Sequence, residues 1–181
     1  MAGYHHGNLR DAILAAAAAV IARDGVGALS MRAIAADLGV SHTAFRRHFG
    51  SREGVLNALA VQGNRLLAAE LRAAAAGGEF IDVGVAYVRF ALAHPGHFTV
   101  MFRSDLLDNR DPELVAARAE AFAPLREGVA AKKLDDPEAA EVTGWGLVHG
   151  IATLALSGSL RPSGDIESLA RRSLSLIYPN R

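Results

Sequence analysis

The sequence predicts an all-α protein with a small N-terminal domain followed by a larger helical body. Apolar residues make up 51% of the 181 residues, which is enough to form a sizeable core. Alanine is abundant, while β-branched and aromatic residues are few, and this balance favours packed helices over sheets. No segment alternates apolar and polar residues for long enough to predict a strand.

Three short helices are predicted before residue 50. Each apolar stretch follows a small polar residue that can cap a helix, and each ends at a glycine. The expected caps are Asn8, Ser30 and Ser41, and the expected stops are Gly25, Gly39 and Gly50. These signals predict a first helix that runs to about Asp24, a second over residues 31–38 and a third that ends near Phe49.

Six further helices are predicted beyond residue 50. The first of them is long, and its apolar stripe consists of Val55, Leu56, Leu59, Leu66 and Leu67. Pro95-Gly96 is expected to end the next helix, and Pro124 to kink or interrupt a later one. The predicted helices cover residues 51–77, 80–93, 97–103, 112–132, 137–157 and 165–178. No apolar run reaches the ~18–20 residues that cross a bilayer, so we expect a cytoplasmic protein with no membrane partner.

No flexible linker divides the chain. We therefore expect the domain boundary inside the long fourth helix, near residue 62, with a small N-terminal domain over residues 1–62 and a larger helical domain over residues 63–181. The formal net charge is zero, but the first 60 residues carry six Arg against four acidic side chains. This asymmetry is small and indicates a nucleic-acid partner only weakly.

The second and third helices form a candidate helix-turn-helix. Ala35 is small where two helices cross, Gly39 can adopt a positive φ in the turn, and Ser41 can cap the next helix. A small core is then expected from Ile34, Leu38, Phe45 and Phe49, and the side chains left facing outward are His42, Thr43, Arg46 and Arg47. A short helix with exposed donors fits the DNA major groove. Two packed helices around a glycine turn, without DNA binding, are the alternative.

Several motifs in this region resemble the DNA-binding domain of the tetracycline repressor (TetR) family. The resemblance covers roughly residues 4–60 and rests on residues 4–10, 28–32, 34–35, 38–41, 47–49 and 52–56. It implies an all-α homodimer with a three-helix DNA-binding head and a variable ligand-binding body. It also implies a palindromic double-stranded operator, and in most members a repressor that a small molecule releases.

The resemblance also suggests which residues contact DNA. Those nearest the bases would be Arg32, His42, Thr43 and Arg46, and those nearest the phosphates Arg47, His48 and Arg52, with Ser30 assisting. The sequence departs from the family at Phe45-Arg46, where the family has Pro or Leu followed by Tyr. Arg46 could read guanine O6 and N7 or hold a phosphate, so the operator should differ from those of tyrosine-bearing relatives.

Residues 94–102 and 145–150 resemble a TetR subgroup with a Trp-His-Gly signature in its body. Trp145 and His149 lie four residues apart and so share one helix face. A candidate ligand cavity would be lined by Tyr87, Phe90, Phe98, Met101, Phe102, Phe122, Trp145 and His149. An aromatic stripe at helical spacing is more often plain core. Gly144, Gly146 and Gly150 fit either room for a ligand or close helix packing.

Other chemistries have little support in the sequence. The chain has no cysteine, which excludes disulfides and thiolate chemistry. The candidate metal ligands His5, His6, His94, His97 and His149 do not show a metal-binding spacing, and no catalytic motif is present. We therefore expect no metal, no cofactor and no enzymatic activity.

The leading hypothesis is a homodimeric, sequence-specific repressor released by a small apolar ligand. The alternatives are a DNA-binding regulator without a small-molecule effector, and a helical ligand-binding protein that has lost DNA recognition. The dimer interface is expected on the last two long helices, at Leu147, Ile151, Leu154, Leu169, Leu174 and Ile177.

Overall fold

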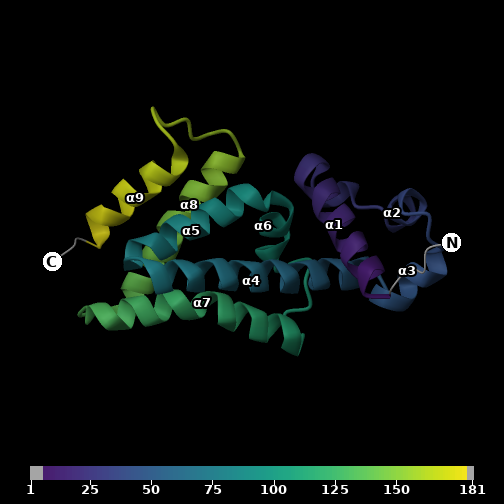
Figure 1. The fold of residues 1–181 in the computed structure, drawn as a ribbon, viewed down its shortest axis with the longest axis horizontal. Helices are drawn as coiled ribbons and strands as arrows, with labels where there is room; N and C mark the ends of the chain where they lie inside the picture. The colour runs from purple at the N-terminus through teal and green to yellow at the C-terminus, as the bar shows by residue number, and fades with distance from the viewer. Residues whose placement is uncertain (1–5, 179–181) are drawn as a thin grey trace. The chain divides into compact units, whose positions relative to one another are not determined.

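The computed structural model describes residues 6–178, with the side chains of residues 6–8, 42 and 44 outside the description. Over residues 6–178 the regular structure is entirely helical (Figure 1). The helices are α1 (His6–Asp24), the 3₁₀ turn η1 (Val26–Ala28), α2 (Met31–Asp37), α3 (His42–Phe49), α4 (Arg52–Gly77), α5 (Phe80–Ala93), α6 (Pro95–Met101), α7 (Pro112–Lys132), α8 (Pro137–Leu156) and α9 (Ile166–Ile177). The predicted all-α class is confirmed.

Side-chain caps fix several helix starts as the sequence predicts. The Ser30 hydroxyl accepts a hydrogen bond of 3.3 Å from the Ala33 N–H at the start of α2. At α8 and α9 the carboxylates of Asp136 and Asp165 accept bonds of 3.0 Å and 2.7 Å from backbone N–H groups three residues later. These oxygens satisfy donors that have no partner within the helix.

Some local predictions differ from the structure. Helix α1 begins at His6, so Asn8 lies in its first turn and is not the cap. Helix α5 ends at Ala93, as predicted from Pro95-Gly96, but α6 begins at Pro95 and not at residue 97, because proline suits a helix start, where its missing N–H is not needed. Helix α7 is not interrupted at Pro124. Within α4, Leu66 is exposed although it was expected in the apolar stripe, and Leu71 is buried.

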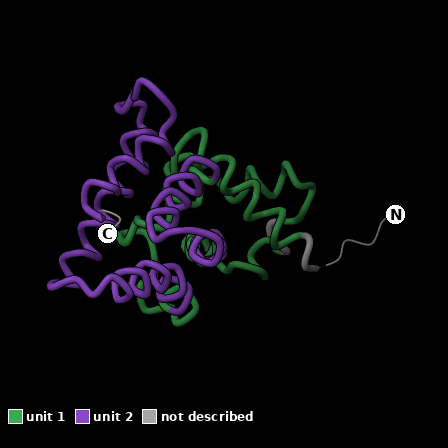
Figure 2. The backbone as a smooth tube through the Cα atoms, turned by 60° about the vertical axis from the view of Figure 1, so that its left-hand side comes forward, with its two compact units in different colours: residues 1–63, 94–115 green, residues 64–93, 116–181 purple. Residues whose placement is uncertain are grey.

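The chain divides into two compact units (Figure 2). Unit 1 contains residues 1–63 and 94–115, and unit 2 contains residues 64–93 and 116–181. Unit 1 thus joins the N-terminal helices and the first part of α4 to α6 and the segment that leads into α7. The predicted boundary near residue 62 stays a prediction. The division into compact units places residues 94–115 together with residues 1–63. Among the described residues, no helix combines the length and the hydropathy needed to cross a bilayer.

Unit 1 is held together by close helix packing around α6. Gly96 lies so close to α1 that a Cβ there would overlap the carbonyl oxygen of Ala18. On α4, a Cβ at Gly63 would lie 2.7 Å from the Met101 sulfur. Small residues at both contacts therefore let α6 approach α1 and α4 closely.

Unit 2 is organised around α5, which packs against both α8 and α9. Gly84 on α5 faces Leu174, because an added Cβ would lie 2.6 Å from its Cδ1 atom. Leu174 and Ile151 are therefore buried within the protomer, and their prediction as dimer-interface residues is wrong. The apolar side chains that α8 and α9 leave exposed include Val142, Leu154, Leu176 and Ile177.

Candidate nucleic-acid interface

The turn between α2 and α3 is a Schellman motif centred on Gly39. Gly39 has φ +64°, a conformation that residues with a Cβ rarely adopt. The Val40 N–H donates to the Ala35 carbonyl at 2.9 Å, and the Gly39 N–H donates to the Ala36 carbonyl at 3.1 Å. These two bonds end α2 and reverse the chain, as expected for a helix-turn-helix.

A small aromatic core fixes α3 against the other N-terminal helices. Phe45 is only 2% exposed, and Ile34 on α2 is equally buried. The Phe45 and Phe49 rings lie 5.8 Å apart between centroids. The Arg10 guanidinium of α1 lies 5.5 Å from the centre of the Phe49 ring, a cation–π contact. Leu38 and Phe49, also predicted as core, are half-buried.

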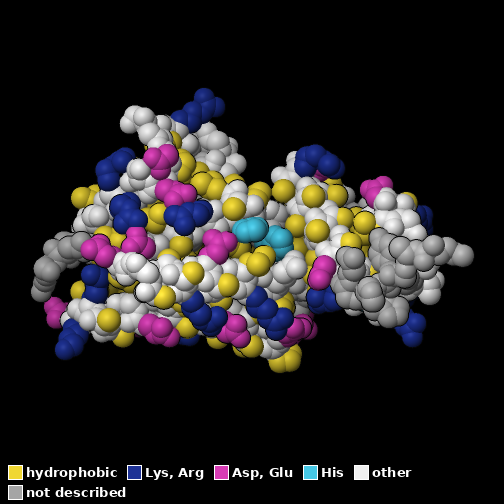
Figure 3. Space-filling model, in the orientation of Figure 1, with side chains coloured by type: hydrophobic (Ala, Val, Ile, Leu, Met, Phe, Trp, Pro, Cys, Tyr) yellow, Lys and Arg dark blue, Asp and Glu magenta, His cyan; other side chains and the backbone are white. Residues whose placement is uncertain are grey.

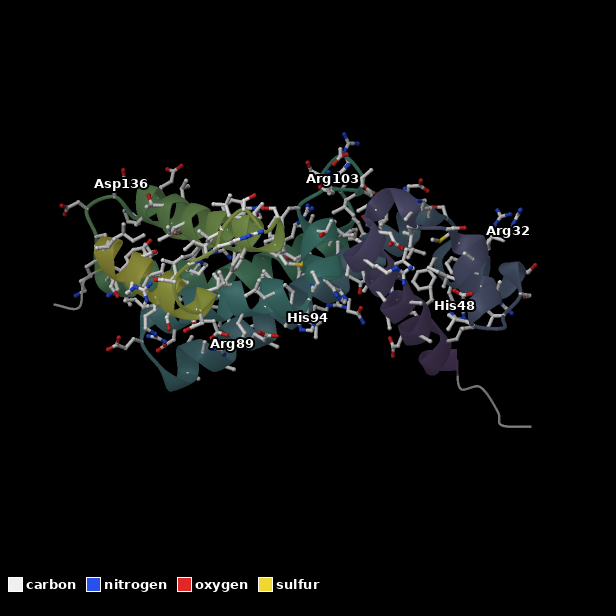
Figure 4. The ribbon with its side chains drawn as sticks, turned by 90° about the horizontal axis from the view of Figure 1, so that it is seen from above. Arg32, His48, Arg89, His94, Arg103 and Asp136 are labelled. Carbon is white, nitrogen blue, oxygen red and sulfur yellow. The ribbon has the colours of Figure 1, made fainter. Side chains whose placement is uncertain are left out.

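The predicted contact residues of α2 and α3 lie mainly on the surface. Thr43, Arg46 and Arg47 are exposed on α3, while Phe45 points inward. Arg32 extends from α2 into solvent (Figure 4). Ser30 is also exposed, and its hydroxyl oxygen is engaged as the α2 cap. His48 is half-buried beside Phe49, and the His42 side chain lies outside the described residues.

Arg52 differs from the expectation that it faces solvent. It is half-buried, and its Nη2 donates to the Val26 carbonyl at 2.6 Å. Its Nε donates to the Leu29 carbonyl at 3.4 Å. The start of α4 is thereby tied to the segment between α1 and α2, because the first turn of α4 brings Arg52 opposite the Val26 and Leu29 carbonyls. Arg52 thus has a structural role that the sequence reading missed.

The junction of α3 and α4 is equally constrained. Gly50 ends α3 with φ +70°, and the Ser51 hydroxyl accepts a bond of 3.2 Å from the Gly54 N–H. A Cβ on Gly54 would overlap the carbonyl oxygen of Phe49. Because that atom belongs to the backbone, only glycine allows α4 to start so close to the end of α3. The angle at which α3 is presented depends on this contact.

The head carries only a small excess of positive charge, six Arg against four acidic side chains in the first 60 residues. Acidic and basic side chains are interspersed over the face shown in Figure 3, in agreement with the zero net charge. Recognition by this head would therefore rely on individual arginines rather than on a broad basic field.

The candidate ligand residues divide between the two units. In unit 2, Trp145 Nε1 donates to the Tyr87 hydroxyl at 3.3 Å, and that hydroxyl lies 2.9 Å from His149 Nδ1. An indole N–H can only donate, so the tyrosine oxygen accepts from it and its own proton is directed to His149. The Phe122 and Trp145 rings meet edge to face at 5.1 Å. This group of four residues is referred to below as the Trp145 cluster.

Burial changes the protonation behaviour of the Trp145 cluster. It raises the pKa of Tyr87 well above its usual range and lowers the pKa of His149. Both groups are therefore favoured in their neutral forms, which suits an apolar environment. Phe90 is fully buried in unit 2. In unit 1, the Phe98 and Phe102 rings lie 5.1 Å apart and Met101 is buried.

The sequence reading also missed Asn57. This α4 residue is 8% exposed, and only one other polar side chain among the described residues, Asn64, is as deeply buried. The two asparagines are seven residues apart, which places them on one face of α4. That spacing on an otherwise apolar face was the available signal, because buried polar groups require partners.

A three-helix head with a glycine turn and an outward-facing arginine-bearing helix defines a DNA-binding transcriptional regulator of the helix-turn-helix class. Comparison with known families specifies it further. Residues 13–59 match the family described as bacterial regulatory proteins of the tetR family, and residues 80–177 match the tetracyclin repressor-like C-terminal domain. The chain therefore belongs to the TetR family.

Similar proteins agree with this assignment. An uncharacterised HTH-type transcriptional regulator of Mycobacterium tuberculosis is 28% identical over 155 residues, which span 82% of this chain and 71% of the relative. A solved structure of a protein of unknown function from Rhodococcus sp. RHA1 has a TM-score of 0.81 at 31% identity, covering 98% of this chain and 97% of that one. The structure of AibR with isovaleryl coenzyme A and operator DNA shares the fold, with a TM-score of 0.72 at 16% identity over 95% of this chain and 99% of that one.

Proposed function

We propose that this regulator is a repressor that binds a palindromic operator as a homodimer, with α3 in the major groove of each half-site. The observation that carries the proposal is the division of α3 into two faces. Phe45 is buried, while Thr43, Arg46 and Arg47 are exposed. A short helix that is anchored on one side and carries donors on the other has the shape that reads base edges.

Within this arrangement, base contacts are assigned to Arg32, His42, Thr43 and Arg46, and phosphate contacts to Arg47 and His48. Arg52 and Ser30 are placed at the edge of the interface, where each also has an internal bond. Arg46 is the residue in which we expect most of the sequence preference to lie, because a guanidinium can make two hydrogen bonds to guanine.

The second subunit is expected to pack against α8 and α9. Leu176 is 85% exposed, Val142 is 61% exposed and Leu154 is 48% exposed. Two such helix pairs can form a four-helix bundle that removes these side chains from water. Two heads related by a two-fold axis would then read two half-sites, which doubles the readout and requires a palindrome.

The effector is expected to be small and largely apolar, and to bind in the regulatory body over residues 63–181. Support comes from the Trp145 cluster, which combines aromatic rings with two polar hydrogen bonds. AibR, which shares the fold, was solved in complex with isovaleryl coenzyme A and operator DNA. Release requires the effector to bind the non-operator state more tightly than the operator state. A repressor of this kind would act in the cytoplasm.

Selection of duplexes from a random DNA pool by the full-length protein tests the proposal. The expected result is a palindromic consensus, protected on both half-sites in footprinting, and sedimentation of the free protein as a dimer at micromolar concentration. Leu176→Glu should weaken the dimer and operator binding together, whereas Val115→Glu, at an exposed apolar position on α7 and not on α8 or α9, serves as the control. A protein that selects no sequence would instead be a helical ligand-binding protein that has lost DNA recognition.

A further inference from the structure

Asn57 on α4 uses both polar atoms of its side chain to hold the segment that leads into α7. Its Nδ2 donates to Asp111 Oδ2 at 2.7 Å, and its Oδ1 accepts from the Asp108 N–H at 2.9 Å. All three residues belong to unit 1. Because Asn57 is only 8% exposed, its polar side-chain atoms have little access to water, and leaving them without partners would be costly.

Asp111 also forms the N-terminal cap of α7. Its second oxygen, Oδ1, accepts from the Glu113 N–H at 2.8 Å and from the Leu114 N–H at 3.3 Å. The pKa of Asp111 is lowered, first by the bond from Asn57 and then by the Glu113 N–H. One carboxylate therefore joins the start of α7 directly to α4, the helix that follows the recognition helix α3.

Helix α7 connects this junction to the Trp145 cluster. It runs without interruption from Pro112 to Lys132 and carries Phe122, whose ring meets Trp145 at 5.1 Å. Backbone hydrogen bonds resist the extension of a continuous helix. A displacement of Phe122 along the helix axis would consequently move the cap, and with it Asn57.

We propose that Asn57 and Asp111 form a latch through which α7 transmits the state of the Trp145 cluster to the DNA-binding head. Asn57 is a positioning residue in this device, since it lies on α4 and not among the DNA contacts assigned above. The inference rests on the proposed function and specifies how that function is regulated. Coupling between two binding sites is reciprocal, so operator binding at the head must also alter the surroundings of Trp145.

This reciprocity allows a test without an identified effector. Trp145 is the single tryptophan of the chain, so its emission reports on unit 2 alone. The full-length protein is titrated with the operator duplex obtained by selection, and with a scrambled duplex of equal length. We expect the wild-type emission to change with the operator and to remain constant with the scrambled duplex at the same salt concentration.

Two variants break the latch in different ways. Asn57→Ala removes both bonds from α4. Asp111→Asn keeps a side-chain oxygen for the α7 cap but presents an amide donor to the amide donor of Asn57. Both should bind the operator within about threefold of the wild type, because neither residue is at the assigned DNA face. Both should lose the emission response. Asn109→Ala is the matched control, because Asn109 bonds to Ser104 and Leu107 in the same segment and should leave the response intact.

Three results would overturn the proposed latch. An undiminished response in Asp111→Asn, with a melting curve like that of the wild type, would overturn the latch. So would a wild-type protein that binds the operator without any change in Trp145 emission, and in that case the proposed function stands. If Asn57→Ala fails to fold, Asp111→Asn decides alone. A wild-type protein that selects no duplex would overturn the proposed function and the latch with it.

Discussion

The Arg52 guanidinium donates a hydrogen bond of 2.6 Å to the carbonyl oxygen of Val26, 26 residues earlier in the chain. With the longer bond to Leu29, this contact joins the start of α4 to the segment between α1 and α2. A charged donor bonded to these two carbonyls stabilises the head itself, in addition to any contact with phosphate.

Arg52→Ala should therefore lower both stability and DNA binding. We expect a loss of about 1.5–3 kcal/mol in the free energy of unfolding, the usual range for hydrogen bonds to charged groups. Arg47→Ala, at an exposed position, should stay within about 0.5 kcal/mol of the wild type. Chemical denaturation checks both variants. The slope of the logarithm of the binding constant against the logarithm of the salt concentration is the second readout. If Arg52→Ala unfolds like the wild type while this slope falls by about one per half-site, Arg52 contacts only phosphate.

Arg46→Ala should reduce discrimination between DNA sequences. If Arg46 reads a base, its removal should cost about 1–3 kcal/mol on the best operator and much less on mismatched DNA. Binding to specific and scrambled duplexes at several salt concentrations provides the measurement. An equal loss on both duplexes would show that Arg46 holds a phosphate and that base reading lies elsewhere on α3.

Gly54→Ala should damage the head although alanine is the better helix former. The new methyl group would overlap the Phe49 carbonyl oxygen, which cannot rotate away, so we expect a destabilisation of about 1–3 kcal/mol and weaker operator binding. Gly146→Ala in α8 is the control, since nothing lies within 4 Å of its added Cβ, and it should stabilise by roughly 0.5–1 kcal/mol. Thermal melts compare the two. Equal effects of the two substitutions would show that α3 and α4 can separate without cost.

Tyr87→Phe should disturb the Trp145 cluster without changing its shape. It removes the acceptor of the Trp145 N–H and the donor to His149, which are 3.3 Å and 2.9 Å away. Leaving buried polar groups without these partners costs about 1–3 kcal/mol. Melting curves and Trp145 emission should both change, while operator selection should not. Unaltered emission would mean that the Trp145 N–H does not depend on the tyrosine oxygen.

Acid should destabilise unit 1 through His97. Burial, and to a lesser degree the charge of His94, lowers the pKa of His97 from 6.5 to about 4. Between these pH values His97 is protonated in the unfolded chain but neutral in the folded protein. Stability that is present above pH 6.5 is therefore lost as the pH falls toward 4. In the folded protein the neutral ring donates from Nε2 to Gln62 Oε1 at 2.9 Å.

His97→Gln should flatten this part of the pH profile, because the replacement does not titrate. Urea denaturation at intervals from pH 7 to pH 4 measures the slope for both proteins. If the variant keeps the full slope of the wild type, other groups are responsible for the acid sensitivity.

The helix-turn-helix could be predicted because its signals are local. Ser30, Gly39 and the alternation of inward Phe45 with outward Arg46 each act within one or two helical turns. Caps and positive-φ turns depend on the backbone around a few neighbouring residues, so the sequence carries them directly.

Partners distant in sequence were not predictable in this way. Leu174 was expected at the subunit interface, because its stripe on α9 is apolar, but packing against α5 at Gly84 buries it within the protomer. Periodicity identifies which residues of a helix seek burial. Periodicity does not identify the surface against which those residues pack.

The sequence by itself therefore determined the all-α class, the recognition helix and most helix ends of this TetR-family regulator. Only the tertiary structure decided that Arg52 binds the Val26 carbonyl, that Asn57 holds the cap of α7 and that Tyr87 lies between Trp145 and His149. Helix signals arise from interactions over a few residues, whereas these pairs are separated by 26 to 62 positions. A long polar side chain on a helix can reach many partners, and the packing of the helices selects one.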